Sequence, residues 1–191
     1  GWHDAGDYGR YVVNSGITSG ELLWTWELFA SHIKNIDLKI PESKNSTPDI
    51  LDEIRWNLDW MLTMQDEDGG VWHKQTSENF ADFVMPENDK LISYVIGTGK
   101  EPFKSTAATA DFAAVMAIAA RTFKPYDAMY AQNCLQAAEK AWGWLQKYPN
   151  VTFRNSPNVL TGGYGDNDCR DELLWAAAEL WRTTRNDNYD Q

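Results

Sequence analysis

The chain has 191 residues, with 17 basic side chains, 28 acidic ones and a formal net charge of −11. This length suits one domain with a sizeable core better than two domains, and a hydrophobic fraction of 43% excludes a disordered polar chain. The acidic balance argues against a nucleic-acid partner, whose binding needs clustered Lys and Arg. No run of about 18 apolar residues occurs, so no membrane-spanning segment is expected.

Helical periodicity dominates the chain. Apolar side chains recur at helical spacing in five segments, which predicts helices over residues 17–33, 47–65, 105–123, 128–148 and from about 168 onward. We expect the fifth helix to bury the apolar stripe Leu174, Trp175, Ala178 and Trp181. The two cysteines, Cys134 and Cys169, allow either one disulfide or two buried thiols.

Two long irregular segments, 66–104 and 149–166, separate the predicted helices. Loops of this length inside a compact domain are usually functional. Short strands are expected only at residues 8–13 and 70–73. Helices joined alternately by short and long loops predict an all-α fold of helical hairpins, with the long loops on one face. Periodicity alone fits a ring of hairpins and a bundle equally well, and no domain boundary divides residues 1–191.

Asp4 and Asp7 stand three residues apart, with the small residues Ala5 and Gly6 between them. Small residues allow a tight backbone turn, so both carboxylates can face one cavity. Glycosidic hydrolysis with inversion needs a carboxylate that deprotonates a water and a carboxylic acid, about 6.5–9.5 Å away, that protonates the leaving oxygen. Two aspartates so close in the chain fit a pair that holds one water, one as base and one as orienter.

Two other interpretations of this pair stay open on chemistry alone. Either aspartate can cap a helix or a loop, which is the more frequent role of two aspartates at this spacing. A calcium loop is the second alternative, although the spacing lacks the further ligands of an EF-hand.

Residues 1–11, GWHDAGDYGRY, resemble the N-terminal active-site motif of glycoside hydrolase family 9. Further segments look like family segments and follow in family order, at residues 48–53, 69–74, 105–112 and 171–177. The resemblance therefore covers essentially the whole chain. It is closest to the bacterial branch in which an immunoglobulin-like module precedes the catalytic domain.

The resemblance implies a toroid of helical hairpins, the (α/α)6 fold. Residues 1–191 then form part of one catalytic domain, truncated at both ends and supplying less than half of it. It also implies hydrolysis of β-1,4-glucosidic bonds in cellulose or related β-glucans with inversion of configuration. Carried over by position, Asp7 is the general base and Asp4 helps to hold the water. No organic cofactor is expected.

The resemblance also suggests four substrate contacts. His73 lies where the family has a histidine-bearing loop at the cleft, and the alternative is an ordinary loop histidine. Trp2 and Trp72 lie in predicted loops and are candidates for stacking on sugar rings, whereas the other tryptophans fall in helical stripes that suit core packing. Tyr164 occupies a neighbourhood in which some family members place a sugar-stacking Trp.

Residues 165–172 resemble the family's calcium loop at the start of a helix. Asp171 and Glu172 match its side-chain ligands, while Asn167 and Asp168 fall where backbone or side-chain oxygens contribute. Hard oxygen ligands clustered in this way suit Ca²⁺, so a structural calcium ion is expected. The alternative is that Asp168 or Asp171 caps the helix and interacts with its dipole.

The family's catalytic acid is a glutamate near the C-terminus of the domain, and neither it nor the preceding His/Arg segment is recognisable here. Glu53 and Glu172 match other motifs and do not fill the role. We therefore expect a parent endo-β-1,4-glucanase, and we expect the 191-residue chain alone to be inactive. One alternative is a catalytically incomplete glucan-binding fragment. Another is a glucoamylase-like or polysaccharide-lyase-like toroid, against which the aspartate motif argues.

The same resemblance suggests the context of the parent protein. A β-glucan polysaccharide is the expected partner, with no nucleic acid and no membrane. An N-terminal immunoglobulin-like module and secretion or cell-surface attachment are expected from the family branch.

Overall fold

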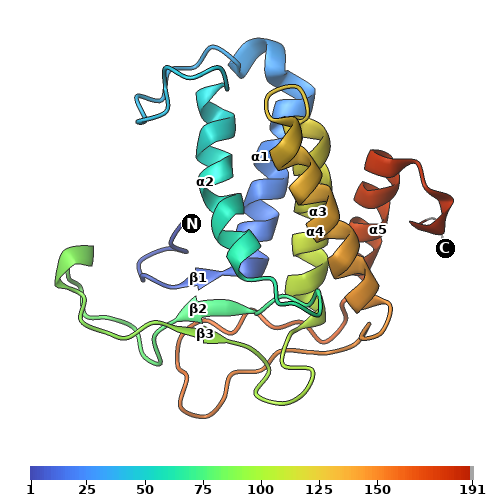
Figure 1. Cartoon of the computed structure of the whole chain (residues 1–191). Coiled ribbons are helices and arrows are strands. Elements are labelled where there is room, and N and C mark those ends of the chain that lie inside the picture. Colours follow the sequence, from blue (N-terminus) through green and yellow to red (C-terminus); the bar gives the residue numbers. More distant parts are fainter. Residues whose placement is uncertain (190–191) are drawn as a thin grey trace.

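The computed structural model describes residues 1–189 and places a layer of α-helices beside a small sheet (Figure 1). The helices are α1 (Val12–Ile33), α2 (Asp49–Thr63), α3 (Thr106–Phe123), α4 (Ala128–Leu145) and α5 (Arg170–Thr184). The strands are β1 (Arg10–Tyr11), β2 (Lys74–Thr76) and β3 (Tyr94–Ile96), and two 3₁₀ turns lie at Pro86–Asn88 and Asp187–Tyr189. All five predicted helices are confirmed, and α1 begins earlier than expected, directly after β1.

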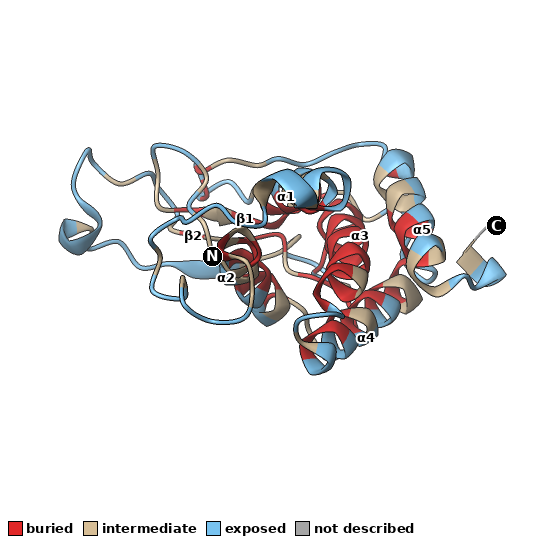
Figure 2. Ribbon diagram, turned by 90° about the horizontal axis from the view of Figure 1, so that it is seen from above, coloured by how far each residue is buried: buried red, intermediate tan, exposed pale blue. Residues whose placement is uncertain are grey.

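Helix α3 occupies the middle of the helical layer, with α1, α4 and α5 around it (Figure 2). Every residue of α3 except Arg121 is buried. A helix that is apolar on all sides belongs in a core, and the many alanines of α3 let its neighbours approach closely. The hydrophobic core is therefore built around this helix.

The predicted apolar stripe of α5 is wrong in part. Leu174 is 70% exposed, Ala178 is exposed as well, and Trp175 and Trp181 are half-buried. The buried residues of the helix are Ala176, Ala177, Glu179 and Leu180. The alanine surface of α3 accepts small side chains closely, so α5 turns Ala176 and Ala177 inward. Trp175 packs instead against Trp24 of α1, with ring centroids 5.7 Å apart.

The sheet ties the N-terminal segment to the long loops. Strand β2 lies in the middle and pairs antiparallel with β1 and β3, so that Lys74 stands opposite Tyr11 on one side and Ile96 on the other. The first predicted strand is confirmed in part at β1. The second was placed too early, because β2 begins at Lys74, and β3 was not predicted.

Both cysteines are free and buried, which decides between the two alternatives for Cys134 and Cys169. Burial raises the pKa of each thiol to about 12, so neither is a reactive thiolate at neutral pH. Within residues 1–189, no helix has the length and apolar character needed to cross a membrane.

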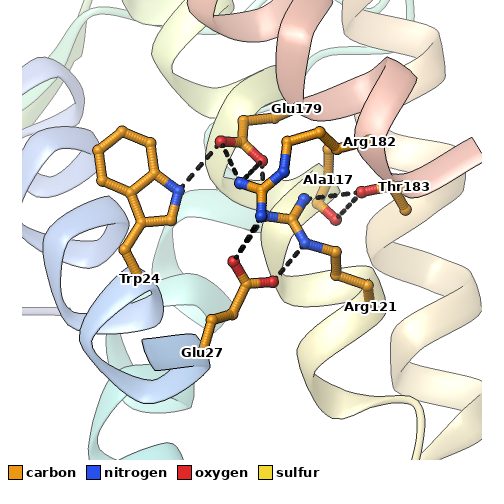
Figure 3. A network of polar contacts seen from close by, with 7 residues as sticks. All are labelled: Trp24, Glu27, Ala117, Arg121, Glu179, Arg182 and Thr183. Atoms are coloured by element: carbon orange, nitrogen blue, oxygen red, sulfur yellow. Dashed lines mark hydrogen bonds and ion pairs between the residues drawn. The ribbon is translucent and has the colours of Figure 1, made fainter. Parts of the chain in front are cut away.

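A network of ion pairs joins α1, α3 and α5 (Figure 3). Arg121 of α3 lies 2.5 Å from Oε1 of Glu27 and 2.5 Å from Oε2 of Glu179. Arg182 contacts the same two carboxylates at 3.2–3.3 Å, and the Trp24 indole donates to Glu179 at 3.0 Å. Glu179 is only 2% exposed, and a buried carboxylate is costly unless it is paired and hydrogen-bonded.

Replacing Arg121 by Met should therefore lower the free energy of unfolding by about 2–4 kcal/mol, because Glu179 stays buried with Arg182 as its remaining cation. Urea denaturation of the full-length protein measures the change. Arg170→Met is the matched control, since it removes an exposed pair with Asp168 and should change stability little. Equal losses in the two variants would contradict the role given to Glu179.

Candidate active site

Asp4 and Asp7 lie in the loop that precedes β1. A backbone hydrogen bond from the Asp4 N–H to the Gly9 carbonyl, at 3.0 Å, closes this loop. Both aspartates are half-buried, while Ala5 and Gly6 between them are exposed. The turn therefore holds two carboxylates at the protein surface without sealing them from solvent.

Each carboxylate accepts a hydrogen bond from a tyrosine. The Tyr11 hydroxyl donates to Oδ2 of Asp7 at 2.7 Å, and the Tyr164 hydroxyl donates to Oδ2 of Asp4 at 2.6 Å. The two tyrosine rings meet edge to face, with centroids 4.8 Å apart. Burial raises the pKa of Tyr11, and the bond to Asp4 raises that of Tyr164. Both phenols therefore remain protonated donors at neutral pH.

The two aspartates differ in how many oxygens are occupied. Asn14 donates its side-chain N–H to Oδ1 of Asp4 at 2.6 Å, so both oxygens of Asp4 hold a donor. Within the described part of the chain, Asp7 accepts a side-chain hydrogen bond only at Oδ2. Oδ1 of Asp7 is therefore the oxygen left free to take a proton.

An open pocket of about 260 Å³ lies beside Asp4, and Trp2, His3, Tyr11 and Asn14 are among its lining residues. Trp2 is fixed there by α2, because its indole N–H donates to Glu53 at 2.6 Å and its backbone N–H to Asn57 at 3.0 Å. The structure thus places Trp2 next to the aspartate motif, where the sequence predicted a sugar contact.

His73 lies outside this pocket and is fully buried. Its Nε2 lies 2.7 Å from the Gly163 carbonyl and its Nδ1 lies 2.8 Å from the Ser105 hydroxyl, which assigns the ring proton to Nε2. The ring also stacks on Phe153, with centroids 3.7 Å apart. The predicted sugar contact does not fit this arrangement, because no face of the ring is accessible. His73 instead holds the segment that ends at Tyr164.

Trp72 lies in a different groove from Asp4. This groove, of about 480 Å³, follows the outer edge of β3 and is also lined by Tyr94 and Arg154. The Nζ of Lys104 lies 4.9 Å from the Trp72 ring centroid, a cation–π contact. Trp72 and Asp4 thus line different pockets, and the sugar contact predicted for Trp72 stays a prediction.

Three residues that organise the site were given no role from the sequence: Tyr11, Asn14 and Lys74. Tyr11 ends β1 and the motif, and Asn14 lies in the first turn of α1. Their closeness in the chain to Asp7 and Asp4 was the signal that could have found them. Lys74 contacts residues more than 80 positions away, namely Asn155, Thr161 and Gly162. Only its position next to His73 hinted at a role.

The predicted calcium loop precedes and opens α5. Asn167 accepts from Arg154 at 3.1 Å, and Asp168 forms an ion pair with Arg170. In the described residues, no three His, Cys, Asp or Glu side chains converge on a point that could hold a metal ion. Calcium also takes amide and backbone oxygens, so the site stays a prediction. Asn167 and Asp168 bind arginines in this structure.

Two carboxyl groups near this loop have buried oxygens without a hydrogen-bond partner among the described residues. These are both oxygens of Asp111 on α3 and Oε2 of Glu172 on α5. Burial raises the pKa of Asp111 well above its ordinary range, with Glu172 and Asp171 adding to the effect. Burial also raises the pKa of Glu172 to about 7. Unpaired carboxylate oxygens fit a cation at the start of α5, as predicted for Glu172.

The buried imidazole of His73 predicts an acid-dependent loss of stability. Burial lowers its pKa from 6.5 to about 4, so its contribution is fully present above pH 6.5 and is lost as the pH falls through 4. The shift corresponds to about 3 kcal/mol. In His73→Asn, the loss of unfolding free energy between pH 7 and pH 4 should be smaller by about this amount, as urea titrations would show. The same substitution at exposed His32 is the control, and an equal effect there would contradict the assignment.

Comparisons with known proteins identify the family of the chain. The model of glycosyl hydrolase family 9 matches residues 1–191. The chain is 46% identical to endoglucanase D of Acetivibrio thermocellus over 191 residues, 99% of this chain and 30% of that protein. It is 44% identical to a xyloglucan-specific endo-β-1,4-glucanase of Bacteroides ovatus over 200 residues, 99% of this chain and 33% of that protein.

A solved family 9 structure from Bacteroides ovatus superposes with a TM-score of 0.92 at 44% identity, covering 100% of this chain and 36% of that one. The chain thus spans about a third of the length of these relatives. The predicted fold class is confirmed, because the helices match part of the (α/α)6 toroid of these structures. The chain belongs to glycosyl hydrolase family 9.

Proposed function

We propose that the parent protein hydrolyses β-1,4-glucosidic bonds with inversion, with Asp7 as the general base and Asp4 as the carboxylate that orients the water. The difference between the two aspartates carries this assignment. Both oxygens of Asp4 already hold donors, whereas Oδ1 of Asp7 accepts no side-chain hydrogen bond from the residues that the structure describes. Family membership supports the reaction class, and Asp7 and Asp4 match the family motif.

In this mechanism a water donates one hydrogen to Oδ1 of Asp7 and contacts Asp4 with the other. Its oxygen attacks the anomeric carbon as the glycosidic bond breaks, and its proton passes to Asp7. The leaving oxygen takes a proton from a carboxylic acid on the opposite side of the sugar. Because the water attacks the face opposite the leaving oxygen, the configuration of the anomeric carbon is inverted. We propose that this acid is a glutamate outside the 191 residues, as the resemblance implies.

We propose a β-1,4-linked glucan as the substrate, because the matched relatives are named as an endoglucanase and a xyloglucan-specific endo-β-1,4-glucanase. Trp2 and Tyr164 are the residues that we expect to contact sugar, since both lie beside Asp4. The N-terminal immunoglobulin-like module and the extracellular location remain predictions from the family branch.

A glucan-binding role without turnover is the second candidate for the chain by itself. The observation that favours it is coverage, since the chain spans 30% of endoglucanase D. The 191-residue chain is therefore expected to show no hydrolysis when purified alone. Release of reducing ends from soluble β-glucan by this chain would refute that expectation.

Replacing Asp7 by Asn should lower kcat of the full-length protein on soluble β-glucan by about 10²–10⁴-fold, the contribution typical of a general base. The Asn amide keeps the shape of the side chain and an acceptor for Tyr11, so KM should change little. Asp4→Asn should lower kcat less, because it weakens only the orientation of the water.

The exposed Asp187 provides the matched control, and Asp187→Asn should leave kcat unchanged. Undiminished turnover in Asp7→Asn would contradict the assignment of Asp7 as the general base. A wild-type protein that binds β-glucan on an affinity gel but releases no product would favour the binding role instead.

We also propose that calcium binds at the start of α5, with Asp171 and Glu172 as side-chain ligands. An ion that binds only the folded state stabilises it, by about 2.7 kcal/mol at 100 times its Kd. Saturating calcium should therefore raise the Tm of the full-length protein relative to EDTA. The double variant Asp171→Asn/Glu172→Gln should lose this difference, while Asp187→Asn should keep it. Equal Tm values for the wild type in calcium and in EDTA would rule the site out.

A further inference from the structure

Lys74 is a lysine in the middle strand of the sheet and is fully buried. Its Nζ donates to Oδ1 of Asn155 at 2.8 Å, to the Thr161 hydroxyl at 3.0 Å and to the Gly162 carbonyl at 2.7 Å. A fourth, longer contact runs to the Thr161 carbonyl at 3.3 Å. All four acceptors are neutral oxygens, and an ammonium group has three donors. Within the described residues Lys74 forms no ion pair, so a buried charge is held by hydrogen bonds alone.

The segment that Lys74 holds leads directly to the aspartate site. Lys74 binds the carbonyl of Gly162, His73 binds the carbonyl of Gly163, and the next residue is Tyr164. Tyr164 has a left-handed backbone with φ of 44°, a conformation that is unfavourable for a non-glycine residue. Two adjacent carbonyls are thus fixed just before the residue whose strained backbone directs its hydroxyl onto Asp4.

Lys74 also lies behind Asp7. It stands opposite Tyr11 in the β1–β2 pair, and its Nζ lies 5.7 Å from the Tyr11 ring centroid. The Tyr11 hydroxyl in turn donates to Asp7. Burial lowers the pKa of Lys74 to about 8, and the negative charge of Asp7 opposes this shift. Lys74 is therefore a cation at neutral pH, on the protein side of the proposed base.

We propose that Lys74 is a positioning residue for the hydrolytic water. Its ammonium holds Thr161 and Gly162 in the conformation that places the Tyr164 hydroxyl on Asp4, and its charge lies behind the Tyr11 ring, whose hydroxyl donates to Asp7. Lys74 does not touch the water or the sugar. This inference rests on the roles proposed above for Asp4 and Asp7.

A lysine that served only to stabilise the fold would behave differently from a positioning residue. Removal of a purely structural lysine lowers Tm and leaves the turnover of the folded enzyme intact. Removal of a positioning residue lowers kcat with little change in KM, because misplacing reacting groups by about 1 Å can cost a hundredfold. If Lys74 acts by positioning Tyr164, the losses of kcat caused by removing Lys74 and by removing the Tyr164 hydroxyl should not be independent.

The test uses the full-length enzyme on soluble β-glucan, with Lys74→Met, Tyr164→Phe and the double variant. We expect Lys74→Met to lower kcat by about 10–100-fold with KM within about threefold of wild type. Because both changes release Asp4, the double variant should lie within about threefold of the slower single variant. Lys74→Arg, which keeps the charge and the donors, should recover part of kcat.

Lys104→Met is the matched control for the loss of a buried lysine. Lys104 is 6% exposed and pairs with Asp66 at 2.6 Å and Asp68 at 3.2 Å, beside Trp72 and away from the aspartate pair. This variant should lower Tm and leave kcat of the folded enzyme unchanged. A fall in kcat equal to that of Lys74→Met would overturn the inference.

Two further results would overturn it: a folded Lys74→Met enzyme with kcat within about twofold of wild type, or single-variant effects that multiply in the double variant. If Lys74→Met does not fold, Thr161→Val removes one acceptor of the ammonium and must lower kcat without raising KM. Asp7→Asn, assayed in parallel, distinguishes failure of the proposed function from failure of the role proposed for Lys74. Wild-type turnover in Asp7→Asn defeats the proposed function, whereas an inactive Asp7→Asn beside a fully active Lys74→Met defeats only the role of Lys74.

Discussion

The buried first turn of α3 is the constraint on which the rest of the site depends. A helix start leaves backbone groups without partners, and here side-chain hydroxyls of the same turn bind both long loops. Thr109 accepts from the Val71 N–H at 3.0 Å, Thr106 accepts from the Val151 N–H at 2.8 Å, and Ser105 contacts His73 at 2.8 Å. Because α3 is buried on all sides, these hydroxyls lie at fixed positions. The two long loops that they bind are therefore held in fixed positions as well.

The aspartate site forms where two segments held in this way meet. One is the motif loop, whose position follows from β1 and the start of α1. The other is the segment from Phe153 to Tyr164, which His73 and Lys74 bind along its length. The contact between Tyr11 and Tyr164 closes the junction. The unequal hydrogen bonding of Asp4 and Asp7 follows from this geometry, because only Asp4 is reached from both segments.

Local signals predicted the helices and the aspartate pair, whereas contacts between distant residues escaped them. The apolar stripe of α2 and the alanines of α3 recur at helical spacing within a few turns, so they can be recognised locally. The motif of residues 1–11 is likewise continuous in the chain. The burial of His73 depends on Gly163, which lies 90 positions away. The exposure of Leu174 depends on the alanine surface of α3 rather than on the pattern of α5. The groove of Trp72 likewise depends on residues distant in the chain, among them Arg154.

The groups that are most costly to fold are concentrated around this junction. Lys74 is a buried cation that forms no ion pair within residues 1–189, His73 is a buried imidazole held neutral, and Tyr164 adopts a left-handed backbone. Elsewhere a buried charge such as Glu179 is matched by two guanidinium groups. Unfavourable groups persist only where the surrounding structure determines them, and they gather at functional sites. The unmatched Lys74 is thus best explained by what it holds in place, since an apolar side chain in the same strand would have formed the core at lower cost.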